Sequence, residues 1–253
     1  MSKFEEMINT IQLGDCYDLI KDIPDNSIDL VYIDVPYLFS HGKGGAGALS
    51  KRVNRLMSEE LISIKDGIDY SIFDELLRVM KNINIFIWCS KQQIYDILHY
   101  FNNLDTSYEI LTWNKTNPIP MVDNTWLPDI EYCLFFREKG KVKLNDGYEL
   151  KSKWYVSPIN KSDKDLYKHP TIKPLELVKR HILHSTQPNN IVLDCFCGSG
   201  TTCLACKETG RRYIGIEIDK EYHKIAVDRL NGINANGQTS IFTDFDSLES
   251  EVN

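Results

Sequence analysis

The sequence predicts an α/β protein in which helices cover both faces of a largely parallel sheet. Short apolar runs of the kind that form buried parallel strands, such as Leu30–Ile33 and Ile191–Asp194, alternate with segments of helical spacing. The stretch 190–217 adds a Gly-Ser-Gly turn between a strand and a helix, and then a second strand that ends in Glu217. Glycines let a ligand approach the backbone, a helix N-terminus offers free N–H groups, and the acid suits a ribose diol. This stretch therefore predicts the nucleotide-binding half of such a sheet.

The position of this unit indicates how the sheet is completed. A dinucleotide-binding fold normally opens with the unit, yet only about 36 residues follow Glu217. The third glycine of the dinucleotide pattern is also absent, with Cys203 in its place, which disfavours NAD. Strands from the first two thirds of the chain must therefore complete the sheet.

Apolar patterning and turn residues place the other elements in order. We expect strands over 9–14, 30–33, 84–89, 108–113, 130–136, 191–194 and 212–217. We expect helices over 18–23, 68–80, 92–101, 175–185, 201–210 and 220–231, the last capped by Asp219. The strand at 130–136 is expected to be antiparallel and near the sheet edge. The glycine-rich segment 38–58 predicts a mobile loop, and the polar, lysine-rich segment 138–168 predicts an excursion from the sheet.

The composition bounds the class of protein. At 253 residues the chain is long enough for one large α/β domain or two small ones, and 42% hydrophobic residues suffice for a core. No run approaches the roughly 18 apolar residues of a membrane span, so no membrane partner is expected. The N-terminus lacks an apolar signal region, and seven cysteines, an odd number, fit free thiols in a reducing compartment. We therefore expect a cytoplasmic protein.

The charge is distributed unevenly along the chain. The formal net charge of −7 by itself disfavours nucleic acid as a partner. The segment 40–58, however, contains four basic residues and no acid, and the segment 139–168 contains eight lysines against four acids. Two basic islands on an acidic chain suit a surface that faces a polyanion, although solvated loop lysines would give the same pattern.

A second motif, Asp34-Val-Pro-Tyr37, contains residues that could take part in catalysis, and it directly follows the apolar strand 30–33. Open α/β sheets place their active sites at the carboxyl ends of the strands. The segments Asp34–Tyr37 and Asp194–Gly200 and the residue Glu217 all lie at such ends, so they can converge in one cleft. Asp194–Gly200 and Glu217 would hold a nucleoside-containing cofactor, and Asp34–Tyr37 would hold the group that is acted on.

Together these motifs resemble the β subgroup of the S-adenosylmethionine-dependent DNA amino-methyltransferases, a family that methylates adenine N6 or cytosine N4. The catalytic motif comes first and the cofactor glycines come last, as in that subgroup. The segments His169–Pro174, Gly14–Cys16 and Trp113–Pro118 also match its pattern. The resemblance covers nearly the whole chain and is weakest over 38–68 and 138–168. It implies a Rossmann-like methyltransferase sheet with a circularly permuted motif order and a small inserted target-recognition region.

The resemblance also implies a division of the chain and a set of partners. Residues 1–137 would carry the catalytic motif and the mobile loop, residues 138–168 would form the target-recognition excursion, and residues 169–253 would bind the cofactor. Double-stranded DNA is the implied substrate, with a homodimer and a restriction endonuclease as further implied partners. The residues expected to contact DNA are Lys43, Lys51, Arg52, Arg55, Lys115, Lys141, Lys153 and Trp154.

By the same resemblance, S-adenosylmethionine lies across the glycine turn. Glu217 would hold the ribose hydroxyls, Asp15 would meet the exocyclic amine of the cofactor's adenine, and Asp194 would face the methionine end. Thr171 and Lys173 would close over the methionine part. The full set expected to bind the cofactor is Asp15, Cys16, Asp34, His169, Thr171, Lys173, Asp194, Phe196, Gly198, Ser199, Gly200, Thr201, Glu217 and Asp219.

The expected catalytic residues are Asp34, Pro36 and Tyr37. An exocyclic amine on adenine or cytosine is a poor nucleophile because its lone pair is delocalised into the ring. Two acceptors aimed at its N–H bonds, the Asp34 carboxylate and a backbone carbonyl beside Pro36, favour a more tetrahedral nitrogen. Proline keeps the turn rigid, and Tyr37 would stack on a base flipped out of the duplex. The methyl group then passes in line, with proximity supplying much of the acceleration, and no metal is needed.

Three alternatives stay open at the level of sequence. Asp rather than Ser at position 34 favours adenine N6 by resemblance, with cytosine N4 as the rival in the same class. Val35 replaces the family's usual second proline, so a methylation-inactive DNA- or cofactor-binding homologue is a rival of another class. The third alternative is a methyltransferase whose acceptor is RNA or a protein glutamine. The basic islands favour nucleic acid over protein as the acceptor.

Two side-chain clusters are interpreted as packing. Four cysteines fall in the glycine turn and on the helix after it, so packing is favoured over a zinc site. His181 and His184 lie at positions i and i+3 of one helix without a third ligand, so we expect an exposed helical face.

Overall fold

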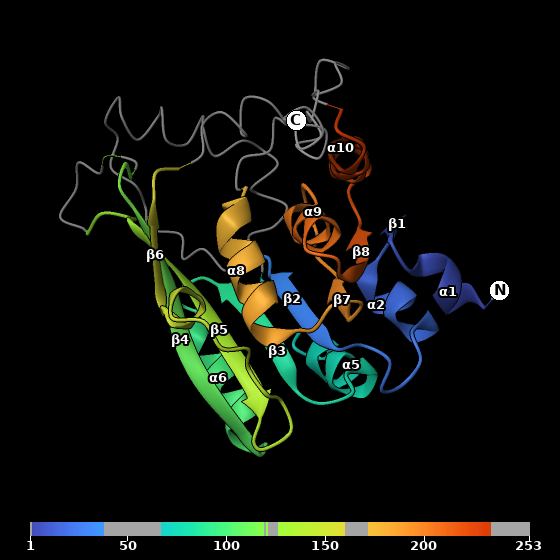
Figure 1. Ribbon diagram of the computed structural model, residues 1–253, viewed down its shortest axis with the longest axis horizontal. Coiled ribbons are helices and arrows are strands. Elements are labelled where there is room, and N and C mark those ends of the chain that lie inside the picture. The colour runs from blue at the N-terminus through green and yellow to red at the C-terminus, as the bar shows by residue number, and fades with distance from the viewer. Residues whose placement is uncertain (1, 38–66, 119, 121–125, 160–171, 234–253) are drawn as a thin grey trace, which may run out of the picture.

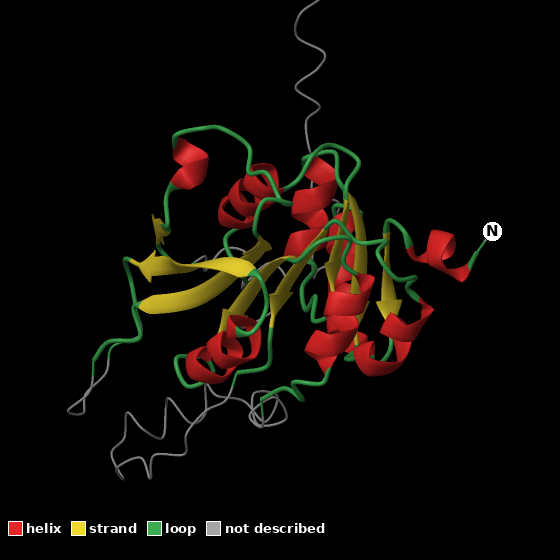
Figure 2. Cartoon of the chain, turned by 90° about the horizontal axis from the view of Figure 1, so that it is seen from below, coloured by secondary structure: helices red, strands yellow, loops and turns green. Residues whose placement is uncertain are grey.

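The computed structural model describes residues 2–37, 67–118, 120, 126–159 and 172–233 of the chain. These residues form a sheet of eight strands with helices on both faces, as Figures 1 and 2 show. The strands are β1 (Thr10–Leu13), β2 (Leu30–Asp34), β3 (Asn84–Cys89), β4 (Thr106–Lys115), β5 (Ile130–Glu138), β6 (Trp154–Ser157), β7 (Ile191–Asp194) and β8 (Arg212–Glu217).

The strand order is β1-β8-β7-β2-β3-β5-β4-β6. Neighbouring strands are parallel except at β5, which is antiparallel to both β3 and β4. Every residue of β3 and β7 is buried, in agreement with their continuous apolar runs. The predicted α/β class with a largely parallel sheet is confirmed.

The helices are α1 (Lys3–Met7), α2 (Cys16–Leu19), α5 (Ile72–Val79), α6 (Ile94–Asn102), α8 (Leu175–Ser185), α9 (Thr201–Glu208) and α10 (Lys220–Leu230). Two further single turns, Ile20–Asp22 and Glu149–Lys151, are 3₁₀-helical. None of the helices in the described ranges is long and apolar enough to cross a membrane.

The side chains of each central strand alternate between two cores. Val31 and Ile33 of β2 face the core that contains the apolar side chains of α5 and α6. Leu30 and Tyr32 of the same strand face the core that contains those of α8, α9 and α10. The sheet is therefore the middle layer of an α/β/α sandwich (Figure 2).

The connections of β2 and β7 create a crevice. In chain order the sheet grows from β2 to β3 on one side, while β7, which pairs with β2 on its other side, leads to β8 in the opposite direction. The connecting segments therefore diverge between β2 and β7. Ligands of open α/β sheets bind at such a switch point, outside the carboxyl ends of the strands.

One expectation about the sheet is wrong. Trp154–Ser157, expected to belong to an excursion from the sheet, forms the edge strand β6 and pairs in parallel with β4. Its side chains alternate between exposed and half-buried, and the backbone hydrogen bonds of β4 supply the partner. Four residues within a polar segment give too short an alternation for the sequence to reveal this pairing.

The expectation of an exposed histidine face on α8 is also wrong for His181. This side chain is 4% exposed and stacks on Phe86 with ring centroids 4.8 Å apart. Its Nδ1 lies 3.2 Å from the Tyr32 hydroxyl, and burial lowers the pKa of His181 to about 3, so the ring is neutral. The helix lies on the sheet with this side chain inward. All seven cysteines are free and buried, in agreement with the packing interpretation.

Candidate functional site

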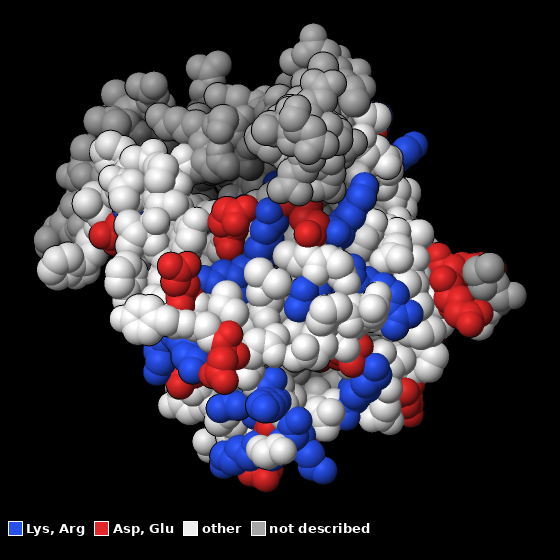
Figure 3. All heavy atoms as spheres, in the orientation of Figure 1, with Lys and Arg blue, Asp and Glu red and all other residues white. Residues whose placement is uncertain are grey.

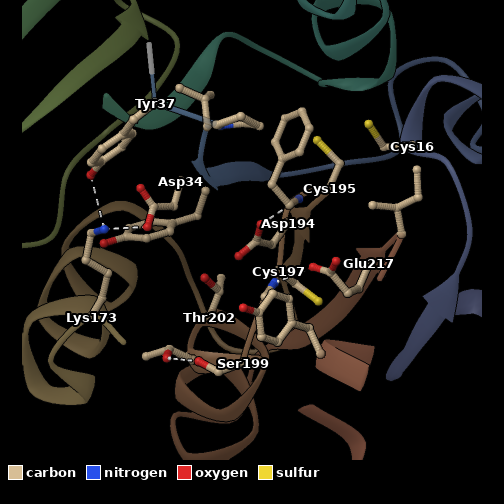
Figure 4. Close-up of a pocket in the computed structure, with 18 of the residues that line it drawn as sticks. Cys16, Asp34, Tyr37, Lys173, Asp194, Cys195, Cys197, Ser199, Thr202 and Glu217 are labelled. Carbon is tan, nitrogen blue, oxygen red and sulfur yellow. Dashed lines mark hydrogen bonds and ion pairs between the residues drawn. The ribbon is translucent and has the colours of Figure 1, made fainter. Parts of the chain in front are cut away.

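A cavity of about 330 Å³ opens at the carboxyl ends of β1, β8, β7 and β2. Figure 4 shows that Asp34, Tyr37 and Lys173 lie on one side of it and that Asp194, Cys195 and Glu217 lie across from them. We call the first side the acceptor half, which comprises Asp34–Tyr37, Glu131 and Lys173. The second side is the cofactor half, which comprises Asp15–Tyr17, Asp194–Thr202 and Glu217.

The glycine turn between β7 and α9 depends on backbone conformations that glycine adopts readily. Gly198 and Gly200 have φ values of +49° and +74°. A Cβ atom at Gly200 would lie 3.0 Å from the Ala226 Cβ on α10. Gly200 therefore serves the turn and its packing against α10, whereas Gly198 and Ser199 line the cavity.

Two buried side chains brace this turn. Glu217 Oε2 accepts a hydrogen bond from the Gly198 N–H at 2.8 Å. Arg229 of α10 donates from Nη1 to Thr201 Oγ1 at 2.8 Å and to the Ser199 carbonyl at 3.2 Å. Among the described residues no side chain caps the N-terminus of α9, which leaves its first N–H groups available to a ligand.

The cofactor half is rich in buried carboxylates. Asp194 and Glu217 are both buried, and among the described residues that line the cavity Lys173, on the opposite side, is the one basic side chain. Burial raises the pKa of Asp194 to about 7, although hydrogen bonds from Thr202 and the Phe196 N–H oppose the rise. Burial also raises the pKa of Glu217. A cationic ligand would favour the ionised form of both carboxylates.

The far end of the cofactor half, around Asp15–Tyr17, is lined by more apolar and aromatic side chains. Asp15 caps α2 through Oδ1, which accepts a hydrogen bond from the Tyr17 N–H at 2.9 Å. Cys16, Tyr17, Phe196 and Ile218 add apolar and aromatic surface to the cavity wall. Apolar and aromatic walls with a carboxylate beside them suit a flat heterocycle that carries an amine.

The acceptor turn is held by two hydrogen bonds. The Val35 N–H donates to the Trp88 carbonyl at 3.1 Å, and the Val35 side chain is buried in the core. Gln93 Nε2 donates to the Pro36 carbonyl at 2.9 Å. A proline at position 35 would lack the N–H, so Val35 exchanges a fixed φ for a hydrogen bond. The replacement of that proline therefore leaves the turn anchored.

Lys173 links this turn to β5. Its ammonium, on a residue that is 6% exposed, contacts Asp34 Oδ2, Glu131 Oε2 at 3.1 Å and the Tyr37 hydroxyl at 3.3 Å. Glu131 Oε1 in turn pairs with Lys115 Nζ at 2.7 Å. Four largely buried charges of alternating sign, Lys115, Glu131, Lys173 and Asp34, therefore form a row, which we call the charged row.

The members of the charged row set one another's protonation. Burial raises the pKa of Asp34, and the Lys173 ammonium opposes that rise. Burial alone would also raise the pKa of Glu131, but Lys173 and Lys115 lower it to about 2. Asp34 Oδ1 is buried and has no hydrogen-bond partner among the described residues. One oxygen of an anchored carboxylate thus remains an acceptor for a ligand.

Most of the expected site residues meet in this cavity. Those that line it are Asp15, Cys16, Asp34, Pro36, Tyr37, Lys173, Asp194, Phe196, Gly198, Ser199, Thr201 and Glu217. Gly200 packs behind the turn, and Asp219 caps α10 through Oδ1. Lys173 lies against Asp34 in the acceptor half. His169 and Thr171 lie outside the described residues.

The residues expected to contact DNA are more dispersed. Lys115 is part of the charged row. Lys153 pairs with Glu109 at 2.5 Å next to Trp154, which is 60% exposed on the edge strand β6. Lys141 follows β5. Because β5 runs antiparallel to its neighbours, it finishes at the end of the strands that is opposite the cavity. Four further residues, Lys43, Lys51, Arg52 and Arg55, lie outside the described part of the chain.

Basic and acidic side chains are interspersed on the face that carries α8 and α9 (Figure 3). Lys151 pairs there with Asp146 at 2.9 Å, and Lys179 of α8 pairs with Glu176 at 3.0 Å. The described part of this face is therefore no continuous basic surface.

Three residues that brace the site were not found from the sequence: Glu131, Gln93 and Arg229. Glu131 gave one signal, because it is an acid within an otherwise apolar strand. That signal becomes informative only when β5 is known to lie between β3 and β4. Gln93 directly precedes α6 and Arg229 lies on α10, and polar residues are ordinary at both kinds of position.

The chemical groups that line the cavity fit S-adenosylmethionine. Glu217 offers a carboxylate to a ribose diol, and Asp194 offers a second carboxylate to cationic groups. The backbone of Gly198 and Ser199 is open to close approach, and Asp15 lies beside the apolar slot. Asp34 Oδ1, which has no hydrogen-bond partner among the described residues, remains for the acceptor. The residues present therefore match a nucleoside with a positively charged tail.

Comparisons with known proteins identify the family. Residues 28–228 match the family of N6 and N4 methyltransferases described as DNA methylase. The chain is 34% identical to the type II methyltransferase M.HinfI of Haemophilus influenzae over 256 residues, which cover 91% of this chain and 70% of that protein. It is 33% identical to the type II methyltransferase M2.LlaDCHI of Lactococcus lactis subsp. cremoris over 236 residues, which cover 86% and 87% of the two chains.

Solved structures agree with these relatives. The crystal structure of M1.HpyAVI in complex with SAM, which is S-adenosylmethionine, superposes with a TM-score of 0.64 at 26% identity and covers 87% of this chain and 98% of that one. The PvuII DNA methyltransferase, described as cytosine-N4-specific, gives a TM-score of 0.66 at 17% identity over 87% and 85% of the chains, and supports the fold alone. The chain belongs to the DNA amino-methyltransferase family and is an S-adenosylmethionine-dependent DNA methyltransferase with a Rossmann-like sheet.

Proposed function

We propose that this protein is a site-specific methyltransferase that methylates the exocyclic N6 of an adenine flipped out of double-stranded DNA. The proposal adds the base and the atom to the chemistry of the family. Aspartate rather than serine at position 34 supports adenine by resemblance. Cytosine N4 is the rival within the family, and the anchored turn at Val35 speaks against an inactive homologue.

The observation that carries the proposal is the state of the Asp34 carboxylate. Lys173 holds Oδ2, and Oδ1 is buried without a partner among the described residues. Lys173 also opposes the rise in the pKa of Asp34 that burial causes, and so favours the ionised form. An amino group whose N–H bond is directed at Oδ1 out of the plane of the ring becomes more tetrahedral, because its lone pair then overlaps less with the ring.

The acceptor turn supplies the second hydrogen-bond acceptor. Gln93 already occupies one lone pair of the Pro36 carbonyl, so we assign the role to the carbonyl of Val35, one peptide earlier. Tyr37 provides the ring on which the base stacks, and its hydroxyl is fixed by Lys173. The turn is thus arranged before the base arrives, which is the condition for electrostatic stabilisation without reorganisation.

The cofactor half holds the methyl donor. S-adenosylmethionine, when bound, supplies a methyl group on a sulfonium centre. Glu217 binds the ribose hydroxyls, Asp15 accepts from the adenine amine, and Asp194 faces the methionine end. The base nitrogen would form an N–C bond to the methyl group as the methyl–sulfur bond of the donor breaks, with the bonding electron pair left on sulfur in a neutral thioether, and it would give up one N–H proton. We assign acceptance of that proton to Asp34 Oδ1, from which it passes to solvent.

Recognition of the target is assigned to the regions that vary most in the family. The segment 138–168, including the exposed Lys153 and Trp154 on β6, and the loop 38–58 with its four basic residues would contact DNA beside the cleft. We further propose that the protein acts in the cytoplasm, forms a homodimer and works beside a restriction endonuclease. The homodimer and the endonuclease extend the family resemblance, and the cytoplasm follows the expectation from the free thiols.

The deciding experiment is to incubate the protein with methyl-labelled S-adenosylmethionine and unmethylated duplex DNA, and to digest the DNA to nucleosides. We expect the label in N6-methyladenine. Label in N4-methylcytosine would select the rival, and label transferred to RNA or protein but not to DNA would overturn the proposal. Cofactor binding without any transfer would identify an inactive homologue.

A further inference from the structure

Glu131 lines the cavity from β5 and is bound at both carboxylate oxygens. Lys115 Nζ lies 2.7 Å from Oε1, and Lys173 Nζ lies 3.1 Å from Oε2. The Tyr37 hydroxyl also donates to Oε2 at 3.4 Å. A carboxylate held from three sides beside the reacting group has a fixed position, yet it lies outside the catalytic motif and about a hundred residues after it.

We propose that Glu131 is a positioning residue for methyl transfer, which fixes the Lys173 ammonium against Asp34 Oδ2 so that Oδ1 alone receives the amino group of the base. The inference rests on the proposed function and deepens it. Glu131 acts through Lys173 and does not itself touch the reacting atoms.

The geometry of Lys173 supports this role. An ammonium group has three N–H donors and no acceptor. Lys173 has three oxygen atoms within reach: Asp34 Oδ2, Glu131 Oε2 and the Tyr37 hydroxyl. These acceptors come from two separate segments of the chain, and Lys173 belongs to a third. With each donor engaged in a buried site, the ammonium has one favourable position, and that position fixes the orientation of the Asp34 carboxylate.

The alternation of charge explains why a second carboxylate is needed. Lys173 alone would bind Asp34 as an isolated pair and would weaken Asp34 as an acceptor. Glu131 shares the ammonium, and Lys115 keeps the row neutral. Several titratable groups shift the pKa of Asp34 or have their own pKa shifted by it. They are Tyr32, Tyr37, Cys89, Glu131, Cys133, Lys173 and Asp194. Of these, Lys173 and Glu131 exert the largest electrostatic effects on Asp34, in opposite directions.

The test is the Glu131→Gln variant of the full-length protein, assayed on duplex DNA. We expect kcat to fall about 10- to 100-fold, because misplacing a catalytic group by about an ångström has an effect of this size. KM and Kd for S-adenosylmethionine should change less than about twofold. Glu131 raises the pKa of Asp34. Without it Asp34 ionises at lower pH, so the acid limb of the kcat profile should move to lower pH.

Two further variants separate positioning from folding. Glu208→Gln is the matched control, because Glu208 also pairs with a lysine, Lys179, but does not line the cavity. Its kcat and pH profile should match the wild type. The double variant Lys115→Met/Glu131→Gln restores neutrality of the row. It should recover the melting temperature if the single variant loses stability, while kcat stays low.

A Glu131→Gln variant with wild-type kcat and pH profile would overturn the inference, and so would recovery of kcat in the double variant. A crystal structure of Glu131→Gln gives a readout independent of activity. An Asp34 carboxylate in its wild-type orientation there would also contradict the positioning role. Absence of methyl transfer by the wild type itself would instead remove the proposed function.

Discussion

The cofactor half of the cavity comes largely from one continuous stretch of chain, whereas the acceptor half is assembled from distant segments. The Gly198 N–H and the Glu217 carboxylate that holds it are 19 residues apart. Lys173 and Asp34 are 139 residues apart, and Tyr37 and Glu131 are 94 residues apart. A half made of local contacts is specified by its own turn chemistry. A half made of distant contacts exists only when the whole sheet has its correct strand order.

The two halves also differ in charge. Asp194 and Glu217 lie in the cofactor half, where none of the described residues that line the cavity is basic, and burial raises the pKa of both. The acceptor half balances two carboxylates with two lysines, and the pKa of Glu131 is lowered to about 2. The carboxylates that line the cofactor half thus lack a basic partner in the cavity wall until a cation binds, whereas the carboxylates of the acceptor half are already paired with lysines. The following experiments test whether this difference controls function.

The largest effect is expected for Asp34→Ala. Removing the acceptor aimed at the reacting amine should slow methyl transfer about 100- to 1000-fold, the range seen when one preorganised group is lost. The affinity for S-adenosylmethionine, measured by calorimetry, should stay within about twofold because the cofactor half is built separately. Asp105→Ala, at an exposed acid before β4, is the control. A parallel loss of cofactor affinity would show that the halves are not independent.

Gly200→Ala should damage the cofactor half through packing. The new Cβ would sit 3.0 Å from the Ala226 Cβ at a φ of +74°, so we expect a loss of about 2–4 kcal/mol in the free energy of unfolding. Denaturant titration measures it. Gly210→Ala is a matched control, with a φ of +71° but no atom within 4 Å of the added Cβ. Its cost should be about 1–2 kcal/mol from backbone strain alone. Equal losses would mean that the contact with α10 is unimportant.

Glu217→Gln should weaken the cofactor half without altering the chemistry. A neutral amide keeps the shape of the side chain but loses the charge-assisted hydrogen bonds to the ribose, so S-adenosylmethionine should bind about 5- to 30-fold more weakly, or about 1–2 kcal/mol. The methylated nucleoside should be unchanged. Glu208→Gln again serves as the control. Unaltered affinity would remove Glu217 from the cofactor site.

The last prediction concerns the pH dependence of cofactor binding. Burial raises the pKa of Asp194 to about 7, so the free protein carries this group protonated below that pH. A cationic ligand prefers the ionised form, and its binding should therefore strengthen as pH rises, by at most about tenfold per unit below pH 7, and level off above it. Calorimetry from pH 5.5 to about 8.5 measures this dependence. In Asp194→Asn the slope over this range should disappear, and a persistent slope would point to another group.

Local signals predicted much of the fold and of the site. The helix over 175–185 was predicted to its end residues, and Asp219 caps α10 as expected. Asp34 and Glu217 line one cavity, as expected, because each is the last residue of a parallel strand. The exceptions have physical causes. β6 is defined by pairing with β4, and His181 is inward because α8 lies flat on the sheet.

The sequence by itself determined most of the elements, the two motifs and most of the residues on the side of the cavity that we call the cofactor half. These depend on hydrophobic periodicity, turn chemistry and strand ends, all of which act over short distances along the chain. Only the tertiary structure decided which charges share the acceptor half. Glu131 reaches Lys173 because β5 runs antiparallel between β3 and β4, and no local pattern encodes that order. The row from Lys115 to Asp34 is thus a property of the assembled sheet.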